Sequence, residues 1–175
     1  MRTNMLLAAA AVAVSLGGCT STSYTENPEE IRLRVGMGGF VKPILERYAD
    51  WDRSGKLIVI DGHMVSADAF GAFSSKNACY TENAIFSPHA ASQLGLVPDY
   101  ALTERLTAML PEALATWFRG NLAYRDWVGF AMVEYPDLLQ IWPEGACEED
   151  HDAALARWRQ RRDAELAEAA LADMR

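Results

Sequence analysis

The sequence has a shortage of positive charge. Its 175 residues include 16 lysines and arginines against 24 aspartates and glutamates, which gives a formal net charge of −8. If an N-terminal segment containing Arg2 is removed, 15 basic residues remain and the net charge becomes −9. Nucleic-acid phosphates and anionic lipid headgroups would both be repelled by this charge. The composition therefore argues against nucleic-acid binding and against membrane adhesion by charge alone.

The sequence also lacks an apolar run long enough to cross a membrane. Its most apolar segment, Met5 to Leu16, is shorter than the about 20 residues that a transmembrane helix needs. Arg2 precedes this segment and Leu16-Gly17-Gly18-Cys19 ends it, which is the layout of an export signal. The ending resembles the lipobox of bacterial lipoproteins, in which the cysteine is acylated and the chain is cleaved before it.

This resemblance implies a lipoprotein signal peptide over 1–18 and a lipid anchor on Cys19. Two or more acyl chains hold a protein stably on a membrane. Thr20 follows the cysteine, so the expected address is the outer membrane, with the protein facing the periplasm. An ordinary secretory signal with a chance cysteine is the alternative. Residues 19–30 are rich in serine and threonine without apolar periodicity, which predicts a flexible tether.

The rest of the chain is organised around residues 57–89. Leu57 to Ile60 is a short, β-branched apolar run, typical of a strand buried on both faces. Ser66 stands at the head of a helical stretch of small residues, and a second buried strand, Ala84 to Ser87, ends just before His89. Helix starts and strand ends meet at one edge of an open α/β sheet, so Ser66 and His89 can converge there.

Periodicity places further elements on both sides of this stretch. The pattern predicts strands over 31–35 and 138–142, helices over 41–51, 100–118 and 126–135, and a charged helix over 148–175. Pro111 should kink or split the helix in which it lies. The strand–helix order implies parallel pairing, and hence a single α/β domain over 31–147. The charged helix either packs loosely on this domain or docks a partner.

Four short motifs in this domain resemble the proteolytic subunit of the Clp protease and its crotonase-like superfamily. Gly62-His63-Met64-Val65-Ser66-Ala67-Asp68-Ala69-Phe70 matches the family's Gly-x-x-x-Ser-x-x-Ala-Phe motif around its nucleophile. His89 matches the histidine base after the next strand, and Gly38-Gly39-Phe40-Val41 matches the oxyanion turn. Arg125-Asp126 precedes Val133-Glu134-Tyr135, as in the family's triad aspartate motif. The resemblance covers about residues 31–142, and the sequence also resembles a group of bacterial envelope proteins.

The resemblance implies a small Clp-protease/crotonase-like sheet with flanking helices, and a catalytic triad. Ser66 would attack a carbonyl, His89 would be the general base, and Asp126 would fix the imidazole tautomer. The N–H groups of Gly39 and Ala67 would bind the oxyanion.

Ordinary structural roles stay open for the three triad side chains. Ser66 and Asp126 could be helix N-caps, and His89 a hydrogen-bonded histidine after a strand. Asp68 is a further objection, because a carboxylate near the oxyanion site would oppose the negative charge.

The remaining cysteines and histidines predict a disulfide and no metal site. Once Cys19 is acylated, Cys79 and Cys147 are left, and two cysteines in an exported domain favour a disulfide over two buried thiols. His63, Asp68 and His89 have no spacing that resembles a metal-ligand motif. No cofactor is expected.

The sequence leaves two functions of different class open. The first is a periplasmic serine hydrolase that acts on a peptide or ester bond. The second is a non-catalytic envelope lipoprotein that keeps the fold and binds a protein or cell-wall partner. A coenzyme A enzyme of the crotonase kind ranks third, because its thioesters are not expected outside the cytoplasm. The sequence names neither a substrate nor an oligomeric state.

Overall fold

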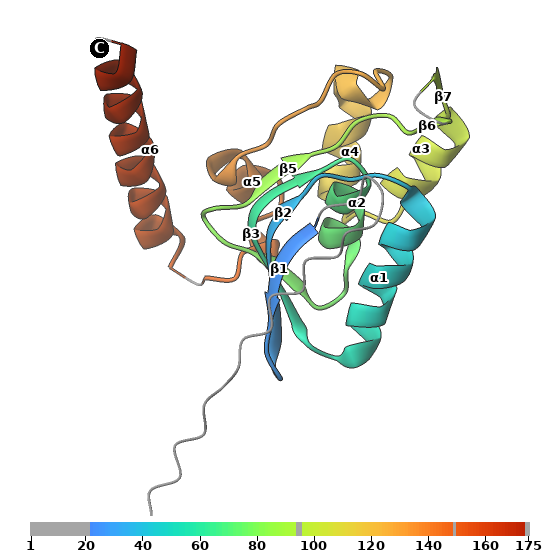
Figure 1. Ribbon diagram of the computed structural model, residues 1–175, viewed down its shortest axis with the longest axis horizontal. Coiled ribbons are helices and arrows are strands. Elements are labelled where there is room, and N and C mark those ends of the chain that lie inside the picture. Colours follow the sequence, from blue (N-terminus) through green and yellow to red (C-terminus); the bar gives the residue numbers. More distant parts are fainter. Residues whose placement is uncertain (1–21, 94–95, 149, 174–175) are drawn as a thin grey trace, which may run out of the picture.

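A computed structural model describes residues 22–93, 96–148 and 150–173 (Figure 1). The signal segment over 1–18 and Cys19 lie outside the described residues, as does the end of the charged C-terminal segment. Among the described helices, none combines the length and the apolar character needed to cross a bilayer.

The described chain is a mixed α/β domain built on a mixed five-stranded sheet. Its strands are β1 (Thr22–Glu26), β2 (Glu30–Gly36), β3 (Leu57–Val65), β4 (Ala78–Tyr80) and β5 (Ile85–Ser87). The order is β1-β2-β3, after which β4 pairs with the first half of β3 and β5 with its second half. β2, β3, β4 and β5 pair in parallel, as the strand–helix order predicts, and β1 joins the edge antiparallel.

Helices fill the connections between and after these strands. They are α1 (Val41–Ser54), α2 (Ala67–Ser74), α3 (Tyr100–Thr107), α4 (Glu112–Gly120), α5 (Tyr135–Ile141) and α6 (His151–Asp173). Short 3-10 helices cover Leu122–Tyr124 (η1) and Pro143–Gly145 (η2), and β6 (Ser92–Gln93) and β7 (Val97–Pro98) form a small hairpin. The predicted split at Pro111 is confirmed, since α3 ends before this residue and α4 begins after it.

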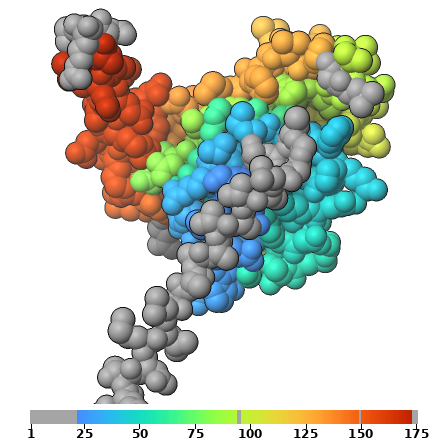
Figure 2. Space-filling view, viewed as in Figure 1, coloured from blue at the N-terminus to red at the C-terminus, as the bar shows by residue number. Residues whose placement is uncertain are grey.

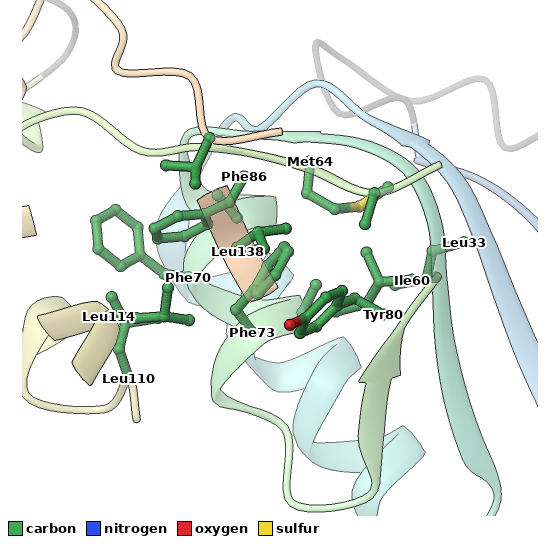
Figure 3. Packing of buried hydrophobic residues seen from close by; sticks show 14 of the residues in the cluster. Leu33, Ile60, Met64, Phe70, Phe73, Tyr80, Phe86, Leu110, Leu114 and Leu138 are labelled. Carbon is green, nitrogen blue, oxygen red and sulfur yellow. The ribbon is translucent and has the colours of Figure 1, made fainter. Parts of the chain in front are cut away.

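The hydrophobic core lies between the sheet and α1, α2 and α4. Every residue of α2 from Ala67 to Phe73 is buried. The side chains of Phe70 and Phe73 lie among the other core side chains (Figure 3). Gly71 allows α1 to approach closely, because a Cβ there would lie 2.2 Å from the ring of Tyr48. Phe73 packs against Phe86 with ring centroids 4.7 Å apart. The strand that ends at Val65 and the helix that starts at Ala67 are therefore both held rigidly.

The flexible tether predicted over 19–30 is wrong where the structure describes it. Thr22–Glu26 form β1, and β2 already begins at Glu30. Threonine and tyrosine favour strands when a partner strand is available, and the ring of Tyr24 packs edge-on against Trp51 at 5.1 Å. Residues 22–30 thus belong to the folded domain, which was predicted to begin at 31.

Two predictions late in the chain are also wrong. Residues 126–134 do not form a helix; the segment runs extended beside β5, where Val133 and Phe86 exchange backbone hydrogen bonds of 2.9 and 3.0 Å. The strand predicted over 138–142 is instead part of α5, which has Pro136 in its first turn and buries Tyr135 and Leu138. A short apolar run fits either element, and here packing decided.

The C-terminal helix α6 is attached to the domain by its first half only. Ala154 is fully buried, Leu155 and Trp158 are partly buried against the core, and Arg157 forms ion pairs with Glu82 and Glu148. The described side chains from 162 to 172 are all exposed. This arrangement agrees with the thin apolar stripe of its sequence.

Candidate active site

Ser66 occupies a strained turn between β3 and α2. Its φ of 57° and ψ of −128° make it the one non-glycine residue with a positive φ among those described. Such a conformation costs about 1–3 kcal/mol and persists only where the surrounding structure imposes it. Here β3 and α2 are buried on both sides of the turn, and the N–H of Ser66 donates to the carbonyl of Ser87 at 3.0 Å. The half-buried side chain is left accessible at the sheet edge.

The hydroxyl of Ser66 meets the imidazole of His89. Ser66 Oγ and His89 Nε2 are 2.8 Å apart, although 23 residues separate them. His89 follows β5, and the N–H of the next residue, Ala90, donates to the carbonyls of Ala123 and Asp126. The ring of Phe130 lies edge-on against the imidazole, with centroids 4.6 Å apart. The fold therefore brings together the proposed nucleophile and base.

The surroundings of His89 keep its imidazole neutral at neutral pH. Burial lowers the pKa of His89 below its ordinary value, against the opposing influence of the backbone at Ala90 and Trp127 and of the Asp126 charge. Its Nδ1 atom is buried, and no acceptor among the described residues meets hydrogen-bond geometry with it. A neutral imidazole can accept the proton of Ser66, which is what a general base requires.

Asp126 lies near His89 but makes no hydrogen bond with it. Its exposed carboxylate accepts the N–H of Val128 at 2.9 Å, and Oδ2 lies close to Gly129. These backbone contacts lower the pKa of Asp126, and the charge of His89 adds to the effect. The alternative role of helix N-cap is wrong, because Asp126 closes a turn in a segment that is not helical. Two members of the predicted triad are assembled, and the third is placed within electrostatic range.

The Gly38-Gly39 turn, which the sequence predicts to contribute to an oxyanion site, lies against Ser66. Gly38 has a φ of 75° and Gly39 a φ of 131°, so both residues adopt conformations that favour glycine. A Cβ at Gly38 would lie 2.4 Å from that of Ser66, which shows how closely this turn approaches the serine. Among the described residues, no acceptor takes the N–H of Gly39 or of Ala67.

The carboxylate of Asp68 is occupied by hydrogen-bond donors of the domain. This fully buried group accepts the N–H of Gly38 at 3.0 Å, the guanidinium of Arg47 at 2.7 Å and the phenol of Tyr48 at 3.0 Å. Thr22 adds a hydroxyl contact at 3.1 Å. Burial raises the pKa of Tyr48 well above its ordinary value, so the phenol stays a donor. The guanidinium of Arg47 thus pairs with the Asp68 charge, and the bond to Gly38 holds the glycine turn in place.

Sequence reasoning missed the partners of Asp68 and a second serine–histidine pair. Arg47 and Tyr48 lie on the inner side of α1 and both donate to Asp68. Nothing in the sequence of this helix indicates that the two neighbours share a buried carboxylate. His63 Nε2 lies 2.7 Å from Ser87 Oγ, but Ser87 is only 1% exposed. Burial lowers the pKa of His63. This pair is closed to substrate and is a structural counterpart of the Ser66–His89 pair.

The remaining predicted residues have clear places. Cys79 and Cys147 form a disulfide with Cα atoms 4.9 Å apart, which ties the end of the compact region to β4. Within the described parts of the chain, no group of three histidine, cysteine, aspartate or glutamate side chains is placed to hold a metal ion.

One hollow lies between Glu82–Ile85 and α6 and another beside α4, and neither includes Ser66 or His89.

Comparison with known proteins adds no identification. No protein-family model matches the chain, and no curated protein and no solved structure matches it significantly. The Clp-protease/crotonase-like resemblance therefore stays a prediction from the sequence motifs.

Proposed function

We propose that the protein is a lipid-anchored periplasmic serine hydrolase with a Clp-protease/crotonase-like domain, acting on a peptide or ester bond. The observation that carries the proposal is the strained Ser66, whose hydroxyl lies 2.8 Å from His89 Nε2. A serine that serves only as an N-cap needs neither a positive φ nor a histidine partner. Strain of this kind clusters at functional sites.

The proposed reaction uses groups already in place. His89 Nε2 takes the proton of Ser66 as Oγ attacks the carbonyl carbon, and the new oxyanion is bound by the N–H groups of Gly39 and Ala67. The imidazolium then gives its proton to the leaving amine or alcohol, which leaves an acyl group on Ser66. Water attacks this ester with His89 again as base, and the acid product leaves. Asp126 favours the imidazolium through its charge.

A fluorophosphonate probe tests this function directly. Natural protein should be labelled at Ser66, Ser66→Ala should remove labelling, and His89→Ala should lower its rate by about 100-fold or more, the usual contribution of a general base. The second pair supplies matched controls: Ser87→Ala and His63→Ala should leave labelling at Ser66 largely intact. Absence of labelling in folded natural protein would contradict the hydrolase.

One observation favours the second candidate, a non-catalytic envelope lipoprotein that binds a protein or cell-wall partner. The carboxylate of Asp126 is engaged by Val128 rather than by His89, so the triad lacks its usual third contact. If Ser66 stays unlabelled in protein shown to be folded, the open edge around it becomes a binding surface. The same preparation would then be tested for retention on peptidoglycan.

The membrane anchor is a separate part of the proposal with its own test. Cys19→Ala should release the protein from membranes into the soluble fraction and remove the mass of the acyl chains. A variant that stays with the membranes at unchanged mass would contradict the lipoprotein signal.

A further inference from the structure

Exposed apolar side chains belong to the two segments that contact the Ser66–His89 pair. Met37 and Phe40 flank the Gly38-Gly39 turn, with 56% and 64% of their surface exposed. Val128, Phe130 and Met132 belong to the segment that contacts His89, with 65%, 52% and 57% exposed. Phe130 touches His89, which fixes this second group at the site. We call these five side chains the apolar rim.

The rim belongs to the end of the sheet at which the loops gather. Figure 2 shows the orange segment that carries residues 128–132 at the top of the molecule, beside the yellow-green β6–β7 hairpin. The hydroxyl of Tyr100, at the start of α3 just after the hairpin, lies 3.5 Å from the carbonyl oxygen of Arg125, just before residues 128–132. Exposed apolar side chains on both segments that meet the Ser66–His89 pair are the kind of surface that marks an interaction site when it is contiguous.

The N-terminus of the described chain starts at this same end. Thr22 is paired with Gly36 across β1 and β2, and its hydroxyl binds Asp68, which in turn holds Gly38. Cys19 precedes Thr22 by only three residues. A chain step spans at most about 3.6 Å, so an acyl anchor on Cys19 is attached within roughly 11 Å of Thr22. The strand β1 shortens the tether that the sequence alone suggested.

We propose that the apolar rim rests on the membrane that holds the Cys19 anchor, and that Ser66 acts on an amphiphile carried there by a long acyl chain. This inference rests on the proposed hydrolase and on the proposed lipidation. The short link brings the glycine turn to the lipid surface, and the apolar side chains give that end a lipid-compatible face. The proposed contact is apolar, so it does not depend on charge attraction between the acidic chain and the lipid headgroups.

Depth-dependent quenching tests the orientation without requiring any catalysis. Phe40→Cys and Val128→Cys place thiols on the rim, and Leu57→Cys is the matched control, 44% exposed at the opposite end of β3. The acylated full-length variants, labelled with a fluorophore, are reconstituted in phosphatidylethanolamine–phosphatidylglycerol vesicles containing nitroxide lipid. Both rim labels should be quenched strongly and the Leu57 label weakly. Equal quenching at all three positions would overturn the proposal. Quenching of the rim labels that weakens as more protein is added per vesicle would also overturn it, because a second copy of the chain would then cover the rim.

The substrate part is tested by comparing two esters. Hydrolysis of a long-chain nitrophenyl ester held in vesicles is measured against a short, soluble nitrophenyl ester. Met132→Ser should lower the ratio of the long-chain rate to the short-chain rate roughly tenfold, because one apolar side chain would no longer be buried in the lipid. Leu57→Ser should leave this ratio unchanged. An unchanged ratio in Met132→Ser would overturn the membrane-borne substrate. Rim quenching in a protein that fluorophosphonate does not label would instead refute the hydrolase and keep the orientation.

Discussion

The carboxylate of Asp68 accepts the backbone N–H of Gly38 at 3.0 Å, and this bond joins the helix that follows Ser66 to the turn that faces it. The same carboxylate binds Arg47 and Tyr48 of α1. The bond occupies the N–H of Gly38, whereas the next N–H, that of Gly39, is the one proposed to bind an oxyanion. One buried carboxylate thus positions the glycine turn.

Replacement of Asp68 should destabilise the fold and should not activate the serine. Asp68→Ala leaves Arg47, Tyr48 and Gly38 without their acceptor, and breaking a buried ion pair from one side costs about 3–5 kcal/mol. Arg47 keeps some access to water, which favours the lower end of this range. Urea unfolding measures the loss. The exposed Asp137→Ala should change stability by less than about 0.5 kcal/mol. Faster fluorophosphonate labelling of Asp68→Asn would mean that the carboxylate faces the oxyanion.

Gly38→Ala should abolish labelling of Ser66. The new Cβ would lie 2.4 Å from that of Ser66 at a φ of 75°, so the turn, the serine or both must move. Gly120 at the end of α4 is the control, because a Cβ there meets no atom within 4 Å. Gly120→Ala should keep both the labelling rate and the far-ultraviolet circular dichroism of the natural protein. A fully reactive Gly38→Ala would show that the turn does not shape the site.

The rate of labelling should follow the protonation of His89. Burial lowers the pKa of His89, so the rate should rise with pH through a midpoint below about 6.5, the ordinary histidine value, and then level off. Asp126 favours the charged imidazole, so Asp126→Asn should move the midpoint to still lower pH. Asp137→Asn, on α5, should leave it unchanged. A midpoint that rises in Asp126→Asn would contradict the electrostatic role of Asp126.

Loss of the Cys79–Cys147 bridge should weaken the domain without dismantling the site. The bridge closes a separation of 68 residues, for which the chain-entropy model gives about 4 kcal/mol. The double variant Cys79→Ser, Cys147→Ser should therefore unfold at lower urea concentration and should still be labelled at Ser66. Added reductant should shift natural protein in the same way and leave the double variant unaffected. Free thiols titrated in unfolded, non-reduced protein would show that the bridge does not form.

Much of the site could be predicted from the sequence because its signals are local. An apolar run ending at a turn, a serine before small residues and a histidine after the next strand are each readable within a few positions. Parallel pairing then follows from the order of strands and helices, since it brings strand ends to one edge. The disulfide was predicted from the number of cysteines in a chain that carries an export-like signal, without any geometry.

The tertiary structure alone decided the features that depend on contacts between distant segments. Thr22 to Glu26 resembles a linker until β2 offers an edge to pair with, and residues 126–134 avoid a helix because β5 binds them. The direction of Asp68 is invisible in the sequence, because two of its hydrogen-bond donors, Arg47 and Gly38, lie 21 and 30 residues away. The separation of Asp126 from His89 Nδ1 is equally a matter of turn geometry. Sequence determines which groups are available, whereas packing determines which of them can meet.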